Sequence, residues 1–154
     1  MRGMSKDHLD RLFTYRLHIL TKLADRGTDA AYQDSFGLSL SEGRVLLTVG
    51  FFSPVSVKDL AARANLDKSQ ASRSTEALIK KGLLVKEPNQ QDGRGVIISL
   101  SGEGAAVYRK GMAIASRRNE ELLSVLDDEE KNVFSRALEK VIQQAQRLNE
   151  TADD

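Results

Sequence analysis

The chain has 154 residues, of which 40% are hydrophobic and 29% are charged, so it is long enough to bury one or two small cores. Because it contains no cysteine, disulfides, zinc ribbons and thiol catalysis are excluded. No apolar run is long enough to span a membrane, and no basic and apolar signal segment opens the chain, so we expect a cytoplasmic protein without membrane contact.

The first predicted element is a long amphipathic helix that begins at Leu9. Its apolar residues recur along one stripe, which consists of Phe13, Leu17, Leu20 and Ala24. Arg11, Tyr15 and His18 share the opposite face of this helix. His8 and His18 are ten residues apart, which is far from the i, i+4 spacing of a metal-binding pair. We therefore expect no metal site here.

Two short helices joined by a tight turn are predicted next. Ser56 can cap the first helix, whose buried stripe consists of Leu60, Ala61 and Ala64. After a turn at Asn65-Leu66, Asp67 offers an N-cap for the second helix. The two helices together have the spacing of a helix-turn-helix.

The second helix, expected from Asp67 to Lys81, has two distinct faces. The apolar face carries Ala71, Thr75, Leu78 and Ile79. The polar face carries Ser69, Arg73, Glu76 and Lys80. Gly82 follows two lysines, so the helix should end where cations favour the negative end of its dipole and glycine can adopt a left-handed conformation.

A β hairpin with a long polar tip is predicted after this helix, with strands at 83–85 and 96–100. Arg94 lies in the tip between two glycines, where its side chain can project into a groove. Asp92 could orient the guanidinium through a bidentate pair, or the two could form an ordinary solvated ion pair. The order helix, turn, helix, strand, wing, strand is typical of a winged helix-turn-helix that reads DNA.

Two more helices are predicted in the C-terminal third. The first spans roughly 101–125, and the second begins after Asp127, which can form a capping box with Glu130. In the second helix, apolar residues recur at spacings of four and three, at Phe134, Leu138, Val141, Ala145 and Leu148. This pattern predicts helix pairing, either with a partner chain or inside a closed monomeric bundle.

The net charge of +1 conceals an uneven distribution of charge along the chain. Residues 56–94 carry eight cations and five anions, whereas residues 119–154 carry four cations and ten anions. Such a distribution would present a basic surface to phosphates and turn the acidic end away from them. Charges that merely solvate helix faces would give similar counts.

Four segments together resemble the MarR (multiple antibiotic resistance regulator) family of transcription factors along nearly the whole chain. They are Val57-Lys58-Asp59-Leu60-Ala61, Leu78-Ile79-Lys80-Lys81-Gly82-Leu83-Leu84, Asp92-Gly93-Arg94, and Ile98-Ser99-Leu100-Ser101-Gly102-Glu103-Gly104. Ser101 stands where the family usually has threonine, and Gly95 where serine or alanine is common.

The resemblance implies a mainly α fold with a small β hairpin (α+β). A winged helix-turn-helix domain over 38–100 would be flanked by a discontinuous helical dimerisation region, 5–37 plus 101–150. Family members are homodimers whose N- and C-terminal helices interlock. We therefore expect a homodimeric, ligand-responsive regulator, a repressor that binds a pseudo-palindromic operator in double-stranded DNA. We expect neither enzymatic activity nor a cofactor.

The expected DNA contacts lie on the second helix and the hairpin tip, and they are Lys68, Ser69, Gln70, Ser72, Arg73, Asp92 and Arg94. The family commonly binds small phenolic or aromatic carboxylate effectors in a cleft beside the dimer helices. Arg11, Tyr15 and His18 could line such a cleft, or they could be solvated or meet a partner chain. Two rival functions are a winged-helix protein-interaction module and a metal-responsive repressor.

Overall fold

The computed structural model describes residues 8–91, 93 and 95–152. The described chain forms two compact units, the first ending at Ser116 and the second beginning at Arg117. Each unit is treated by itself below. Among the described residues, no helix is long and apolar enough to cross a membrane.

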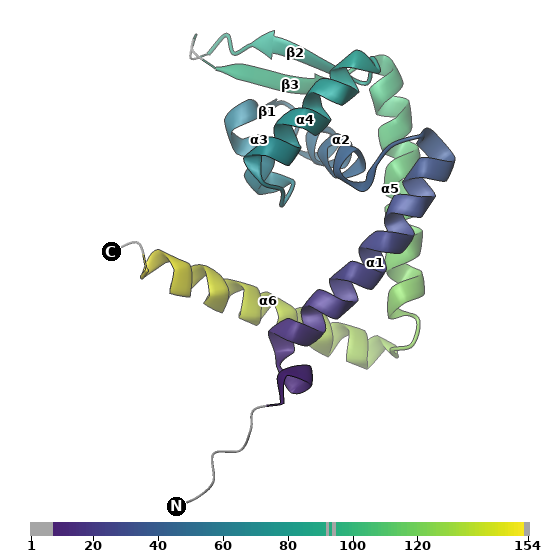
Figure 1. The fold of residues 1–154 in the computed structure, drawn as a ribbon, viewed down its shortest axis with the longest axis vertical. Helices are drawn as coiled ribbons and strands as arrows, with labels where there is room; N and C mark the ends of the chain where they lie inside the picture. The colour runs from purple at the N-terminus through teal and green to yellow at the C-terminus, as the bar shows by residue number, and fades with distance from the viewer. Residues whose placement is uncertain (1–7, 92, 94, 153–154) are drawn as a thin grey trace, which may run out of the picture. The chain divides into compact units, whose positions relative to one another are not determined.

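Helices dominate both units (Figure 1). In chain order, the elements of the first unit are the 3₁₀ helix η1 (Leu9–Arg11), α1 (Phe13–Phe36), α2 (Leu40–Phe52), β1 (Val55–Ser56), α3 (Val57–Arg63), α4 (Lys68–Lys80), β2 (Leu84–Pro88), β3 (Val96–Leu100) and most of α5 (Gly102–Leu123). The second unit contains the end of α5 and α6 (Asp128–Glu150). The mainly α fold with a small antiparallel β element confirms the fold class predicted from the sequence.

The three strands form one antiparallel sheet in the order β1-β3-β2. The sequence predicted β2 and β3 but not β1, because two residues are too few to show an alternating pattern. β2 begins at Leu84 and continues to Pro88, beyond the predicted end at Val85. Proline is tolerated there because β2 is an edge strand, where a missing N–H breaks no ladder on the open side.

The core of the first unit forms around α2. Leu46 of α2, Leu60 of α3, Leu78 of α4 and Ile98 of β3 are all fully buried in one apolar cluster. These four residues come from four different elements, so the cluster fixes the two helices of the helix-turn-helix against the sheet. The apolar stripes predicted for both helices are therefore confirmed at Leu60 and Leu78.

Two glycines let α2 approach its neighbours closely. A Cβ atom at Gly43 would overlap the ring of Tyr32 in α1, and one at Gly50 would overlap the ring of Tyr108 in α5. Any larger side chain at these positions would push the rings away and displace the helices that carry them. α2 is therefore packed tightly against both flanking helices of its unit.

The start of the chain differs from the prediction of one continuous helix beginning at Leu9. Residues Leu9–Arg11 form a single 3₁₀ turn, Leu12 is extended (φ −64°, ψ 132°), and α1 begins at Phe13. Apolar periodicity predicted the helix correctly but not its first residue, since the same spacing of apolar residues continues across the point where the helix is interrupted. Arg11 therefore does not lie on α1.

α6 has the predicted start and the predicted apolar stripe. The carboxylate of Asp127 accepts from the amide of Glu130 (2.8 Å), and the carboxylate of Glu130 accepts from the amide of Asp127 (3.1 Å), which confirms the capping box. Phe134, Val141 and Leu148 of the stripe are exposed. The same holds in the first unit for Phe13, Leu17 and Leu20 of α1.

Candidate nucleic-acid interface

α4 is held at both ends by local signals in its own sequence. The carboxylate of Asp67 caps the helix by accepting from the amide of Gln70 at 2.8 Å, as predicted. At the other end, Gly82 adopts the left-handed conformation (φ +74°), which confirms the predicted stop. The helix thus begins and ends where the sequence indicated.

One face of α4 is buried against the core of its unit. It consists of Ala71, Ser74, Thr75 and Leu78. The hydroxyl of Thr75 donates to the carbonyl of Ala71 at 2.7 Å, so this buried group is satisfied within the helix. The burial of Ser74 was not predicted, because a serine gives no apolar signal to a search for hydrophobic periodicity. This face fixes the rotation of α4 about its own axis.

The opposite face of α4 carries the predicted DNA contacts. Lys68, Ser69, Gln70, Ser72 and Arg73 are all exposed. Ser69, Ser72 and Arg73 follow the i, i+3, i+4 spacing of a single helix face. The structure therefore brings these predicted residues together on one polar surface, within the first two turns of a rigidly seated helix.

Positive charge accompanies this polar surface. A hollow of about 510 Å³ between α3, α4 and the hairpin has an apolar floor and is lined by Lys58, Lys68 and Lys86 from three different elements. Glu76 lies on the exposed side of α4, where its carboxylate is 3.6 Å from the ammonium of Lys86 in β2. The acidic residue on this side is thus opposed by a lysine of the neighbouring strand.

The hairpin formed by β2 and β3 follows α4 directly (Figure 1). The amide of Asn89 donates to the carbonyl of Gly95 at 2.8 Å, and the amide of Gly93, which is left-handed (φ +66°), donates to the carbonyl of Asn89 at 2.9 Å. These bonds close the base of the hairpin tip. Asp92 and Arg94, predicted to contact DNA, lie outside the described residues.

The three residues predicted for an effector cleft are exposed, but they do not come from one helix. Arg11 lies in η1, whereas Tyr15 and His18 lie in α1. His18 borders a hollow that measures about 590 Å³ and is also lined by Thr21, Lys22, Asp25, Arg26, Asp29 and Leu40. Within the part of the chain that is described, no three acidic or histidine side chains are grouped so that they could hold a metal ion.

Two acidic residues of this second hollow are engaged by α2. The carboxylate of Asp25 is 2.6 Å from the guanidinium of Arg44, and that of Asp29 accepts from the amide of Leu40 at 2.8 Å. Both contacts join α1 to α2, and neither was predicted, since the partners are 19 and 11 residues apart. Lys22 and Arg26 are the exposed cations at the same hollow.

Helices α2, α3 and α4, with a three-stranded sheet whose hairpin follows the third helix, make this chain a winged helix-turn-helix protein. Residues 36–95 match the model of the MarR family, which is the family that the four sequence segments resemble.

Known proteins resemble the chain well beyond the matched segment. It is 28% identical over 105 residues to the HTH-type transcriptional regulator BilQ of Clostridium symbiosum, which covers 68% of this chain and 73% of BilQ. A MarR/EmrR family transcriptional regulator from Acinetobacter sp. ADP1 superposes with a TM-score of 0.83 at 24% identity, covering 91% of this chain and 99% of that one. MepR of S. aureus, solved as a DNA complex, has a TM-score of 0.75 at 19% identity, covering 86% of this chain and 98% of MepR. At these identities the solved structures establish the fold alone.

Proposed function

We propose that the protein is a homodimeric transcriptional regulator that represses genes by binding an operator in double-stranded DNA. The observation that carries this proposal is the polar, partly basic face of α4, because it is exposed along a helix whose other face is locked into the core. A rigid helix with polar side chains on its first turns is the element that enters a major groove in helix-turn-helix proteins. The proposal is also supported by MepR, which has the same fold and was solved as a complex with DNA.

In this proposal the exposed residues at the start of α4 have three different roles. Arg73 contacts a guanine, since its guanidinium can bond both acceptors that guanine presents in the major groove. Ser69 and Gln70 lie close to base edges, whereas Lys68 and Ser72 contact phosphates. The wing residue Arg94, oriented by Asp92, enters the flanking minor groove and responds to its width and potential.

Dimerisation is proposed from the exposed apolar side chains of α1 and α6. Phe13, Leu17 and Leu20 of α1 are exposed, as are Phe134, Val141 and Leu148 of α6. A second copy of the chain is the partner that would cover both stripes, as the family resemblance implies. Two-fold symmetry then requires a pseudo-palindromic operator whose half-sites are about one helical turn apart.

The effector is proposed to be a small phenolic or aromatic carboxylate molecule. Among the predicted residues, His18 supports this best, because it borders a hollow whose exposed cations, Lys22 and Arg26, would attract a carboxylate. The two acidic residues there, Asp25 and Asp29, are already engaged by α2 and would oppose an anion less than free carboxylates do. Binding of the effector would either release the operator or tighten the complex, and the protein would act in the cytoplasm.

Titration of duplex DNA at several salt concentrations tests the proposed function. A dimer that neutralises about 6 to 10 phosphates should lose about 10³ to 10⁵ in affinity between about 50 and 200 mM salt, because binding releases condensed counterions. Fluorescence anisotropy of a labelled duplex measures this slope. A flat response, or no binding, would favour a winged-helix module that docks on proteins, since the fold alone does not determine the function.

A further inference from the structure

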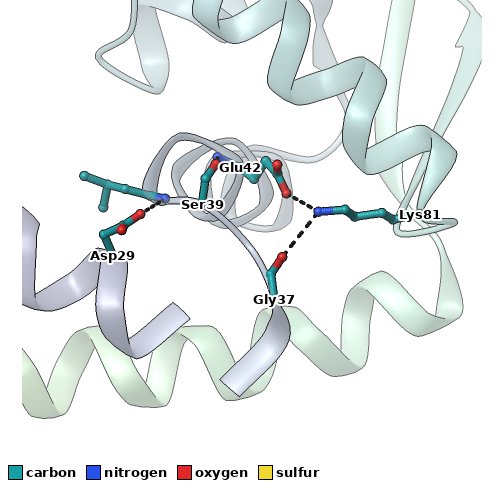
Figure 2. Close-up of polar contacts among 6 residues, drawn as sticks. Asp29, Gly37, Ser39, Glu42 and Lys81 are labelled. Carbon is teal, nitrogen blue, oxygen red and sulfur yellow. Dashed lines mark hydrogen bonds and ion pairs between the residues drawn. The ribbon is translucent and has the colours of Figure 1, made fainter. Parts of the chain in front are cut away.

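Lys81, the residue that follows α4, reaches across to the corner between α1 and α2 (Figure 2). Its ammonium lies 2.6 Å from the carboxylate of Glu42 and 3.4 Å from the carbonyl of Gly37. Glu42 belongs to the first turn of α2, and its side chain is only 17% exposed. Gly37 ends α1 in a left-handed conformation (φ +65°). One side chain thus joins the C-terminal end of α4 to two other helices.

The corner that receives Lys81 is itself held by polar contacts. The hydroxyl of Ser39 caps α2 by accepting from the amide of Glu42 at 3.1 Å. The carboxylate of Asp29 in α1 accepts from the amide of Leu40, the first residue of α2, at 2.8 Å (Figure 2). Because the backbone on both sides of the corner is fixed, Glu42 offers Lys81 a stationary partner.

We propose that Lys81 is a positioning residue for DNA recognition, which sets the direction of α4 by anchoring its C-terminal end to Glu42 and the α1–α2 corner. This inference rests on the proposed function, because it assigns a role to a residue behind the reading face of α4. In this arrangement Lys81 contacts protein groups only, whereas Ser69, Gln70 and Arg73 are the residues proposed to contact the bases.

The length of α4 explains why an anchor at its C-terminal end affects the position of its N-terminal end. α4 has 13 residues and is about 20 Å long, so a tilt of about 5° at Lys81 would move the opposite end by about 1.7 Å. Hydrogen bonds to base edges do not tolerate such a shift, since they weaken steeply outside a narrow range of distance and angle. Attraction to phosphates, which depends mainly on charge, does tolerate it.

Lys81 contributes little to the stability of the fold. Leu78, one turn earlier, is fully buried and already holds α4 to the core. The side chain of Lys81 is 41% exposed, and ion pairs of partly exposed groups contribute little to stability. The contact of Lys81 therefore sets the direction of α4, whereas the packing of Leu78 holds the helix to the core.

Specific and non-specific DNA affinity, measured side by side, test the proposal. The probe for specific binding is the duplex recovered from a randomised library with the wild-type protein, and the probe for non-specific binding is poly(dI-dC). Lys81→Met, which keeps the apolar stem, should lower the ratio of specific to non-specific affinity about 2- to 30-fold, the range of coupling effects from residues outside a binding site. Its salt dependence should equal that of the wild type, because the lost charge contacted no phosphate.

Three further variants separate positioning from other roles. Glu42→Gln should lower the ratio as much as Lys81→Met, and the double variant should lower it no further, since both changes remove the same contact. Lys81→Arg should restore the ratio, because guanidinium also donates to carboxylate and carbonyl oxygens. Lys110→Met removes an exposed charge of α5, away from α4, and should leave the ratio unchanged.

Several outcomes would overturn the proposal. If Lys81→Met flattened the salt dependence, Lys81 would be a phosphate contact. If thermal unfolding shifted while the affinity ratio stayed constant, its role would be structural only. Additive effects of Lys81→Met and Glu42→Gln would exclude a shared contact. A wild-type protein that enriches no duplex would instead refute the proposed function, and this inference with it.

Discussion

Similar apolar patterns are buried in the helix-turn-helix core but exposed in α6. In α3 and α4, the predicted apolar residues Leu60 and Leu78 are fully buried. In α6, a longer and more regular stripe leaves Phe134, Val141 and Leu148 exposed, and no residue of that helix is buried. A periodic stripe thus shows that a helix has an apolar face, but not whether that face is covered within the chain.

This difference separates two sources of stability. The helix-turn-helix core buries its apolar side chains against other elements of the same unit, so its stability should not depend on protein concentration. α6 would gain cover from the partner chain that we propose, so its contribution should rise with protein concentration. The following predictions test this contrast and the proposed roles, from the largest expected effect to the smallest.

Leu78→Ala should lower the free energy of unfolding by about 2 to 5 kcal/mol, because it leaves a cavity in a fully packed core. Urea unfolding at two protein concentrations should give the same loss at both. Leu148→Ala is the matched control in α6, and its loss should be smaller and should depend on concentration. Equal losses that are independent of concentration would contradict the contrast between the two regions.

The double variant Val141→Glu, Leu148→Glu should weaken dimerisation at least about tenfold, because burying two unpaired carboxylates in an interface costs the free energy of their hydration. Sedimentation velocity over a range of concentrations measures the change. Asn132→Glu with Gln143→Glu adds the same charge to the opposite face of α6 and should leave the dimer intact. If both double variants dissociated equally, net charge would explain the effect and the stripe would not.

Arg73→Ala should cost about 1 to 3 kcal/mol of operator affinity and relax base preference at one position in each half-site, if the guanidinium bonds a guanine. Selection from randomised duplexes reads out the preference. Arg94→Ala should instead act at A·T-rich flanks, where minor-groove potential is strongest. Arg63→Ala, which removes an exposed cation stacked on Phe52, should leave base preference unchanged. An unaltered preference in the Arg73 variant would place its role on phosphates.

Glu76→Gln should change the free energy of unfolding by less than about 1 kcal/mol, because its pair with Lys86 is exposed and 3.6 Å long. Any loss should disappear in about 1 M salt, where charges on the surface are screened. Thermal unfolding at low and high salt measures both effects. A larger loss that persisted in high salt would show that the contact is less exposed in solution than its accessibility indicates.

Local signals in the sequence determined the elements of the DNA-reading module. Asp67, Ser56 and Asp127 were predicted as helix caps, and each accepts from the amide three residues later. Gly82 was predicted to end α4 and has the left-handed backbone. The exposed face of α4 followed from its periodicity. All these features depend on residues within one or two helical turns, so a linear pattern contains them.

Only the tertiary structure decided which distant residues meet. Nothing near Lys81 in the sequence pointed to Glu42, 39 residues earlier, and the pairs Asp25–Arg44 and Val55–Ile98 were equally invisible. The break at Leu12 that separates Arg11 from α1 was also missed. Caps, turns and helix faces arise from forces that act within a few residues. Contacts between helices and between strands depend on how the whole core packs, and no short stretch of sequence records that packing.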